Sequence, residues 1–288
     1  MSLTSILLIV VSAGLHVTSH AAMKRAQNRM AFIWWMWFWV ALFFLPVLLL
    51  TPQQIPGSTW ALMGASAILD ALYYRSLARA YQTGELSIVY PLARGTAPIF
   101  ILAWSMLWLN ERPSMGGIIG IGVIVIGLAA LNLPRRSDWR YLLRAFATPA
   151  PRWALIAGLC TSLYTTVDRV GVSSVSPLLY TYVTMTMMVI CLTPGILKTI
   201  GWQGLKDEFH ASKFNSMIAG VLAMAAYSIV LVTMQQGLPA SYAGATREIS
   251  VVFGTLIGIV LLKEQGSVMR VVGSVLVAIG AGTVALLG

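Results

Sequence analysis

Charged residues are scarce in this sequence. Asp, Glu, Lys and Arg together make up only 10% of its 288 residues, whereas 58% of the residues are hydrophobic. An average soluble domain contains about 25% charged residues. The scarcity of charge therefore excludes an ordinary soluble domain and favours a chain that lies in a lipid bilayer.

Cysteines are few, and nucleotide-binding loops are missing. The two cysteines, Cys160 and Cys191, both lie in apolar runs, where a free thiol behaves as a small hydrophobic group. They predict neither a disulfide framework nor a metal site. The sequence contains no glycine-rich phosphate-binding loop, so ATP is not expected as the direct energy source. We predict a protein that needs no cofactor.

Acidic residues are outnumbered by basic ones, 9 against 19, which gives a formal net charge of +10. The basic residues lie mainly in short segments beside apolar runs. This is the usual pattern of cytoplasmic loops, so a nucleic-acid partner is not expected.

Apolar runs follow one another along the whole chain, and a run of about 20 residues is long enough to cross a hydrocarbon core as a helix. The first run has no basic residue ahead of it, so we expect a retained helix rather than a signal peptide. The sequence predicts an all-α polytopic membrane protein. Its ten predicted helices cover residues 4–23, 31–50, 59–80, 87–109, 114–133, 153–170, 177–198, 215–236, 240–262 and 267–287.

The two halves of the chain resemble each other at a fixed offset of 153 residues. We predict a first five-helix repeat at 1–133, a basic connecting loop at 134–152 and a second five-helix repeat at 153–288. An odd number of helices per repeat makes the second half enter the membrane in the opposite sense, as in inverted-repeat transporters with a central cavity. The matched pairs include Arg94 with Arg247, Glu111 with Glu264, Gly120 with Gly273 and Gly127 with Gly280.

Lys and Arg are distributed unevenly among the predicted loops. Most of them follow odd-numbered helices, while the even-numbered connections contain little more than Arg112 and Arg169. By the positive-inside rule the basic loops face the cytoplasm. The sequence therefore predicts a multi-pass protein of the cell inner (plasma) membrane with both termini outside.

The sequence resembles the EamA family, the ten-helix branch of the drug/metabolite transporter superfamily. The resemblance rests on the segment 75–80 (RSLARA) before the predicted fourth helix, on 107–113 (LWLNERP) and on the echo at 261–265 (LLKEQ). Spaced glycines follow the last two segments, namely Gly116, Gly117, Gly120, Gly122 and Gly127 after the first of them and Gly273 and Gly280 after the second. Asn110 and Lys263 stand where the family usually has Gly before its Glu. The resemblance implies a ten-helix basket that alternates between inward and outward openings, with helices three, four, eight and nine as cavity walls. It also implies cytoplasmic termini, in disagreement with the charge distribution.

Arg94 and Arg247 lie about two turns inside the predicted fourth and ninth helices. A charged side chain at membrane depth is costly unless it pairs with another charge or faces a water-filled cavity. Arg offers a planar fork that suits a carboxylate or phosphate group. We expect both arginines to bind an anionic substrate, with a structural ion pair as the alternative.

Further polar and aromatic residues accompany the arginines. Tyr90 shares a helix face with Arg94, Tyr74 and Tyr227 are matched at the repeat offset, and Trp37 belongs to an aromatic run that opens the second helix. These residues are candidate substrate contacts, and packing or interfacial anchoring is the alternative.

Asp70 shares a helix face with Tyr73 and Tyr74. Three residues, Asp70, Arg75 and Glu248, are candidates for proton coupling or for ion pairing.

His16 and His20 lie four residues apart in the first helix. His16 is a candidate substrate contact, and the pair is suited to proton relay, metal contact or simple hydrogen bonding. A metal site needs a third ligand, and none is evident nearby, so we predict no metal site.

These observations favour a secondary transporter, more readily an exporter, of a small anionic or zwitterionic metabolite. Amino acids, opine-type metal chelators and organophosphonates fit. The expected partners are this metabolite and the lipid bilayer, and the protein is expected to be a monomer or a homodimer rather than an enzyme. The alternatives are a cation or drug exporter and a membrane-embedded lipid-modifying enzyme. The absence of any acidic residue from the first helix is evidence against the cation or drug exporter.

Overall fold

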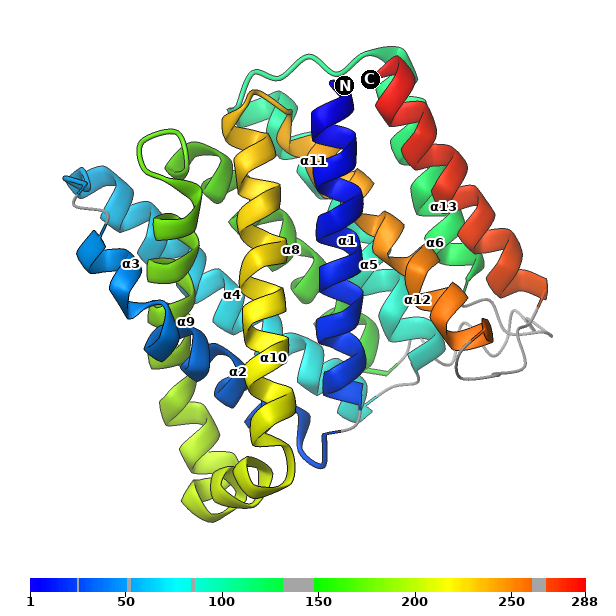
Figure 1. The fold of residues 1–288 in the computed structure, drawn as a ribbon. Helices are drawn as coiled ribbons and strands as arrows, with labels where there is room; N and C mark the ends of the chain where they lie inside the picture. The colour runs from blue at the N-terminus through cyan, green and yellow to red at the C-terminus, as the bar shows by residue number, and fades with distance from the viewer. Residues whose placement is uncertain (25, 51–52, 84–85, 132–147, 261–267) are drawn as a thin grey trace.

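A computed structural model describes residues 1–24, 26–50, 53–83, 86–131, 148–260 and 268–288. Within these residues every regular element is helical (Figure 1). The first half contains α1 (Leu3–Lys24), α2 (Arg29–Phe43), α3 (Leu45–Leu50), α4 (Gly57–Thr83), α5 (Leu86–Trp108) and α6 (Met115–Ala130). The second half contains α8 (Ala150–Gly171), α9 (Pro177–Thr199), α10 (Gly201–Gln235), α11 (Ala240–Thr246), the 3₁₀ turn η1 (Arg247–Ile249), α12 (Ser250–Val260) and α13 (Val268–Leu287).

Most of the predicted helices agree with these bounds to within a few residues, and three differ. The second is interrupted at Phe44, because Pro46 has no backbone N–H to continue the ladder of α2. The eighth begins earlier, at Gly201, and is bent at Ser212, where the backbone is not helical. The ninth is broken at Arg247 by the turn η1.

Among the described residues, four helices are long and apolar enough to cross a membrane by length and composition. They are Leu3–Met23, Pro177–Thr199, Gly201–Gln235 and Val268–Leu287, and shorter apolar helices lie at Arg29–Phe43, Leu92–Trp108 and Met115–Ala130. The breaks at Phe44 and Arg247 shorten two of the other predicted spans, and charged residues interrupt α4 and α8. The number of ten spans therefore stays a prediction.

Helices from the two halves pack against each other in a reciprocal pattern. Helix α4, which is the third predicted helix of the first half, packs on α8, the first helix of the second half. In the corresponding pair, α10 of the second half packs on α1 of the first half. Likewise α4 contacts α9 while α10 contacts α2, and α6 lies beside α13 (Figure 1). Each half is thus completed by the other, and the cavity described below lies between them.

Glycines allow the close approach of α6 and α13. A Cβ atom on Gly120 would lie 2.8 Å from the carbonyl oxygen of Gly280, and one on Gly127 would lie 2.8 Å from that of Gly273. Gly120 and Gly273 are matched by the repeat offset, as are Gly127 and Gly280, so the second contact is the first one with the two halves exchanged. The matched glycines of the sequence therefore form a two-fold contact in which the helix backbones touch, as small residues permit in membrane helices.

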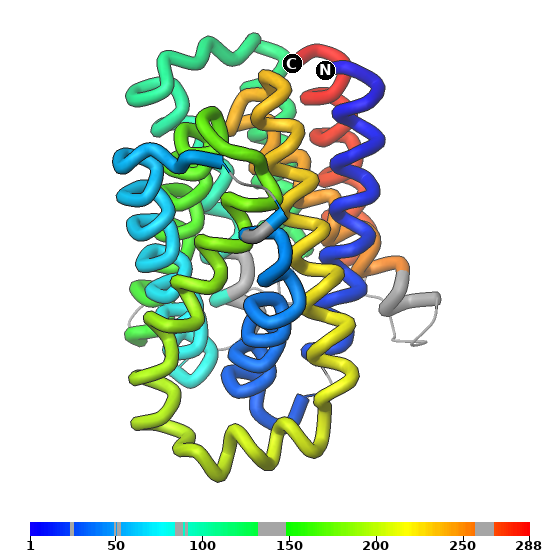
Figure 2. Tube along the Cα trace, turned by 60° about the vertical axis from the view of Figure 1, so that its left-hand side comes forward, coloured from blue at the N-terminus to red at the C-terminus, as the bar shows by residue number. Residues whose placement is uncertain are grey.

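Both chain termini lie at one end of the bundle (Figure 2). The N-terminal ammonium donates a hydrogen bond to the carbonyl of Ala285 at 3.0 Å. At the same end the carboxylate of Glu111 accepts a hydrogen bond from the backbone N–H of Ala240 at 2.7 Å and another from the Ser241 hydroxyl. This Glu of the first half thus caps a helix of the second half.

Candidate functional site

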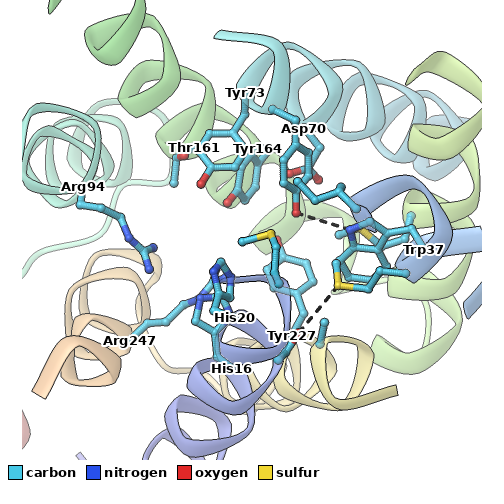
Figure 3. A pocket seen from close by; sticks show the side chains of 17 residues that line it. His16, His20, Trp37, Asp70, Tyr73, Arg94, Thr161, Tyr164, Tyr227 and Arg247 are labelled. Carbon is cyan, nitrogen blue, oxygen red and sulfur yellow. Dashed lines mark hydrogen bonds between the residues drawn. The ribbon is translucent and has the colours of Figure 1, made fainter. Parts of the chain in front are cut away.

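A central cavity lies between the two halves and encloses about 750 Å³ of unoccupied space, including its mouth. Its walls come from α1, α2, α4, α5, α8, α9, α10 and η1. Figure 3 shows arginine, histidine, tyrosine and aspartate side chains around it.

The arginines Arg94 and Arg247 reach this cavity from α5 and η1. Their guanidinium groups point toward each other from one side of the cavity (Figure 3). Nη1 of Arg94 lies 3.4 Å from Oε1 of Glu248, so the ion pair joins the two halves. The guanidinium of Arg247 lies over the ring of Tyr227, 5.3 Å from its centroid, in a cation–π contact.

The break in the ninth predicted helix positions Glu248. A 3₁₀ turn is tighter than an α-helical turn, and here it directs the residue after Arg247 onto Arg94 of the other half. The side chain of Glu248 is 6% exposed, and its second carboxylate oxygen is buried without a hydrogen-bond partner. The Glu248 carboxylate therefore contacts Arg94 through Oε1, and its Oε2 makes no hydrogen bond.

A second, smaller cavity of about 380 Å³ borders the same arginines. Arg94, Arg247, Thr161 and Tyr227 line both cavities, and Glu248 lines the smaller one. The arginines therefore stand at the boundary between two spaces inside the bundle.

Tyrosines form the wall between the arginines and the opposite side of the central cavity. The rings of Tyr73 and Tyr164 are 6.3 Å apart and those of Tyr164 and Tyr227 are 6.4 Å apart, all in edge-to-face orientation. Tyr74 accepts a hydrogen bond of 3.4 Å from the indole nitrogen of Trp37. These rings come from α4, α8, α10 and α2, so the aromatic wall is shared by both halves.

Asp70 lies across the tyrosines from the guanidinium groups (Figure 3). It is 5% exposed, and one of its carboxylate oxygens is buried without a hydrogen-bond partner. Arg75 is exposed, and no ion pair joins it to Asp70 in the described part of the chain. Asp70 and Arg75 are therefore not paired, because Arg75 stands five positions further along α4, about 140° around the helix from Asp70.

A second acid, Asp168 of α8, lies behind the cavity wall and is fully buried. Its carboxylate accepts a hydrogen bond of 2.8 Å from the Tyr180 hydroxyl and another from the Tyr227 hydroxyl. Two donors that satisfy a buried carboxylate stabilise its ionised form. Tyr227 thus joins this acid to the cavity.

His16 and His20 of α1 line the cavity with ring centroids 4.2 Å apart. Nε2 of His16 is buried without a hydrogen-bond partner. Among the described residues no cluster of three or more His, Cys, Asp and Glu side chains comes together to hold a metal ion. The histidines therefore present hydrogen-bonding groups to the cavity beside the arginines.

The structure brings most of the sequence-predicted residues to one place. Arg94, Arg247, Tyr74, Tyr227, Trp37, His16 and Asp70 all line the central cavity. Arg75 lies outside it, Glu248 lines the smaller cavity, and the side chain of Tyr90 lies outside the described residues.

Sequence reasoning did not select Thr161, Tyr164 or Asp168, which all belong to α8. An acidic residue near the end of a predicted span was the available signal for Asp168. Tyr164 precedes it by four residues and so shares its helix face.

A bundle of apolar helices around a polar cavity has the architecture of a membrane transport protein. The model of the EamA-like transporter family matches residues 3–133 and 149–286. The chain therefore belongs to the EamA family of the drug/metabolite transporter superfamily, as the sequence motifs predicted. A solved crystal structure has the same fold, with a TM-score of 0.72 at 14% identity over 100% of this chain and 98% of the other. The comparison with curated proteins found no match.

Proposed function

We propose that this protein is a secondary transporter that moves a small anionic or zwitterionic metabolite across the membrane by alternating access. Amino acids, opine-type metal chelators and organophosphonates have suitable charge. Membership of a transporter family supports transport. The observation that carries the substrate class is the approach of two guanidinium groups from different halves to one cavity.

Charge at the boundary of the two cavities supports this substrate class. Guanidinium groups inside a bundle need an anionic partner or water, and Glu248 partners Arg94 through one oxygen only. Arg247 has an aromatic ring as its partner rather than a carboxylate. A carboxylate, phosphate or phosphonate group of a substrate gains two forked donors at this place.

The proposal includes ten membrane spans in two inverted five-helix repeats, with export as the direction. The reciprocal packing of α4 on α8 and of α1 on α10, together with the two-fold glycine contact, supports the inverted repeat. Both termini lie at the same end of the bundle, in agreement with an even number of spans. The distribution of Lys and Arg supports an orientation in which this end faces the outside of the cell.

The experiment that tests the substrate class is thermal stabilisation of the purified protein by a panel of carboxylates, amino acids and phosphonates. A ligand that binds only the folded protein raises its apparent stability. We expect stabilisation by at least one member of the panel in the wild type, and its loss in Arg94→Ala and Arg247→Ala. Arg75→Ala is the matched control, because this arginine is exposed and lies outside the cavity.

Two results would contradict the proposal. One is stabilisation by organic cations and by no anion or zwitterion. The other is a shift that persists in both cavity-arginine variants while these remain folded. The first result would favour a cation exporter, for which the unpartnered Asp70 is the observation in support.

A further inference from the structure

The strongest unassigned feature of the cavity is its charge separation. Two guanidinium groups lie on one side, and a carboxyl group, that of Asp70, lies on the other beyond the tyrosines (Figure 3). The Asp70 side chain is buried and has an oxygen without a partner. A buried ionised carboxylate without hydrogen bonds is costly, and a proton or a cation on it removes that cost.

We propose that Asp70 is a proton-exchange site, and that its proton is replaced by the ammonium group of a zwitterionic substrate whose acid group binds Arg94 and Arg247. This inference rests on the proposed function and narrows its substrate class to zwitterions. It also names the coupling ion.

The groups around Asp70 determine the charge balance. The titratable and charged groups that face this cavity or border it are Tyr73 and Tyr74 of α4, Arg94 of α5, Tyr164 and Asp168 of α8, Tyr180 of α9, Tyr227 of α10, Arg247 and Glu248 of η1, and His16 and His20 of α1. When the histidines and tyrosines are neutral, these groups together with Asp70 comprise two cations, Arg94 and Arg247, and three acids, Asp70, Asp168 and Glu248.

This set is electrically neutral when one of the three acids is protonated. The carboxylate of Glu248 is paired with Arg94. The carboxylate of Asp168 accepts hydrogen bonds from two tyrosine hydroxyls. Asp70 has neither kind of support at its buried oxygen, so the proton belongs on Asp70.

The exchange moves one charge, because a zwitterion brings no net charge and the loss of the Asp70 proton leaves one negative charge on the loaded set. When the ammonium group of a zwitterion approaches, the Asp70 O–H bond breaks, the proton leaves to the water at the open side of the cavity, and the carboxylate pairs with the ammonium. When the substrate leaves on the other side, a proton from that side binds the carboxylate again. The empty carrier returns neutral, so one substrate crosses the membrane against one proton.

The first test needs no substrate. Infrared difference spectra of the purified protein in lipid bilayers, recorded as the pH is raised, report the carbonyl stretch of a protonated carboxyl group. We expect the wild type to contain one such titrating band. The band is lost in Asp70→Asn and restored in Asp70→Glu. Asp168→Asn is the matched control and retains it. No titrating band in the wild type, or a band that persists in Asp70→Asn, overturns the proposal.

The second test uses two probes that differ only at the amine. The first probe is a mixture of alanine, aspartate and phenylalanine, and the second is a mixture of lactate, malate and phenyllactate, in which a hydroxyl group replaces the ammonium. In weakly buffered solution, the amino-acid mixture is expected to release about one proton per protein, by linkage between substrate and proton. The hydroxy acids are expected to release none, and Asp70→Asn to release none with either mixture.

The outcomes separate this inference from the proposed function. If hydroxy acids stabilise the wild type but not Arg94→Ala, the proposed anion site is supported. If amino acids then release no proton, the proton exchange is overturned. Equal proton release by both mixtures overturns it as well, because the ammonium group would then play no part. If no anion or zwitterion stabilised the wild-type protein, that result would instead contradict the proposed function.

Discussion

The two arginines occupy matched positions in the two halves, but the helices that carry them differ. Helix α5 runs unbroken from Leu86 to Trp108 although Pro98 lies within it. Its counterpart contains no proline between Ala240 and Val260, and yet it is divided at Arg247. Proline therefore does not locate the break. The broken helix is the one whose Glu248 reaches across to the other half.

The break makes the two arginines chemically unequal. Arg94 has a carboxylate partner, whereas Arg247 lies against the ring of Tyr227. The contact between α6 and α13 shows the opposite case, because there the two halves meet through equivalent glycines at equivalent distances. The halves are alike where glycines hold α6 against α13 and unlike at the arginines that line the cavity.

The largest difference is expected between the two arginine variants. Arg94→Ala leaves the carboxylate of Glu248 buried without its partner, and loss of one member of such a pair costs about 4 kcal/mol. Arg247→Ala removes a cation–π contact, which costs about 1 kcal/mol. Unfolding of the purified variants by denaturant measures both losses.

A double variant controls this prediction. Arg94→Ala combined with Glu248→Gln removes the orphaned charge and should recover most of the stability. Equal losses in the two single variants would mean that Glu248 does not depend on Arg94.

The contact between α6 and α13 should respond equally from both sides. Leu at Gly127 or at its partner Gly273 places side-chain atoms where the opposite backbone already lies, and such overpacking costs about 3 kcal/mol. Gly122→Leu is the control, because nothing lies within 4 Å of a Cβ atom at that position. Thermal unfolding in detergent measures the loss, and a stable Gly127→Leu protein would contradict the described approach of the helices.

Glu248→Gln is expected to tighten anion binding. The carboxylate of Glu248 competes with a substrate acid for Arg94, and an amide keeps the shape but loses the charge. We expect affinity for the best anion of the panel to rise about tenfold, equivalent to about 1.4 kcal/mol. Calorimetric titration of wild type and variant measures it. Weaker binding in Glu248→Gln would show that the carboxylate assists the substrate rather than competing with it.

The sequence predicted the helical fold, the family and most of the cavity, because each rests on local patterns. Hydrophobic runs mark the helices, and the offset of 153 residues brings Arg94, Arg247, Tyr74 and Tyr227 into matched positions that line one cavity. Membrane depth makes a charged residue conspicuous without any knowledge of its contacts.

The contacts themselves could not be predicted in the same way. Asp70 and Arg75 are close in sequence and remain apart, whereas Arg94 and Glu248 are distant in sequence and form an ion pair. The break at Arg247 coincides with that distant contact, and no proline in the sequence marks it. Asp168 was missed because its partners, Tyr180 and Tyr227, come from two later helices.

The smallest effect is expected from the hydroxyl groups beside the arginines. Thr246 donates a hydrogen bond to the carbonyl of Tyr242 one turn before the break, and such bonds can bend a helix. Thr96 makes the same bond to Leu92 within the unbroken α5. The hydroxyl alone therefore does not break a helix here, and the ion pair of Glu248 is the remaining difference.

Thr246→Val and Thr96→Val should accordingly behave alike. Each loses one hydrogen bond within its own helix, and we expect a loss of stability of about 1 kcal/mol or less with unchanged anion affinity. Denaturant unfolding and calorimetric titration of the two variants measure these quantities. A change in anion affinity in Thr246→Val as large as that in Glu248→Gln would assign the break to the hydroxyl. Anion affinity that responds only to Glu248→Gln assigns it to the ion pair between the halves.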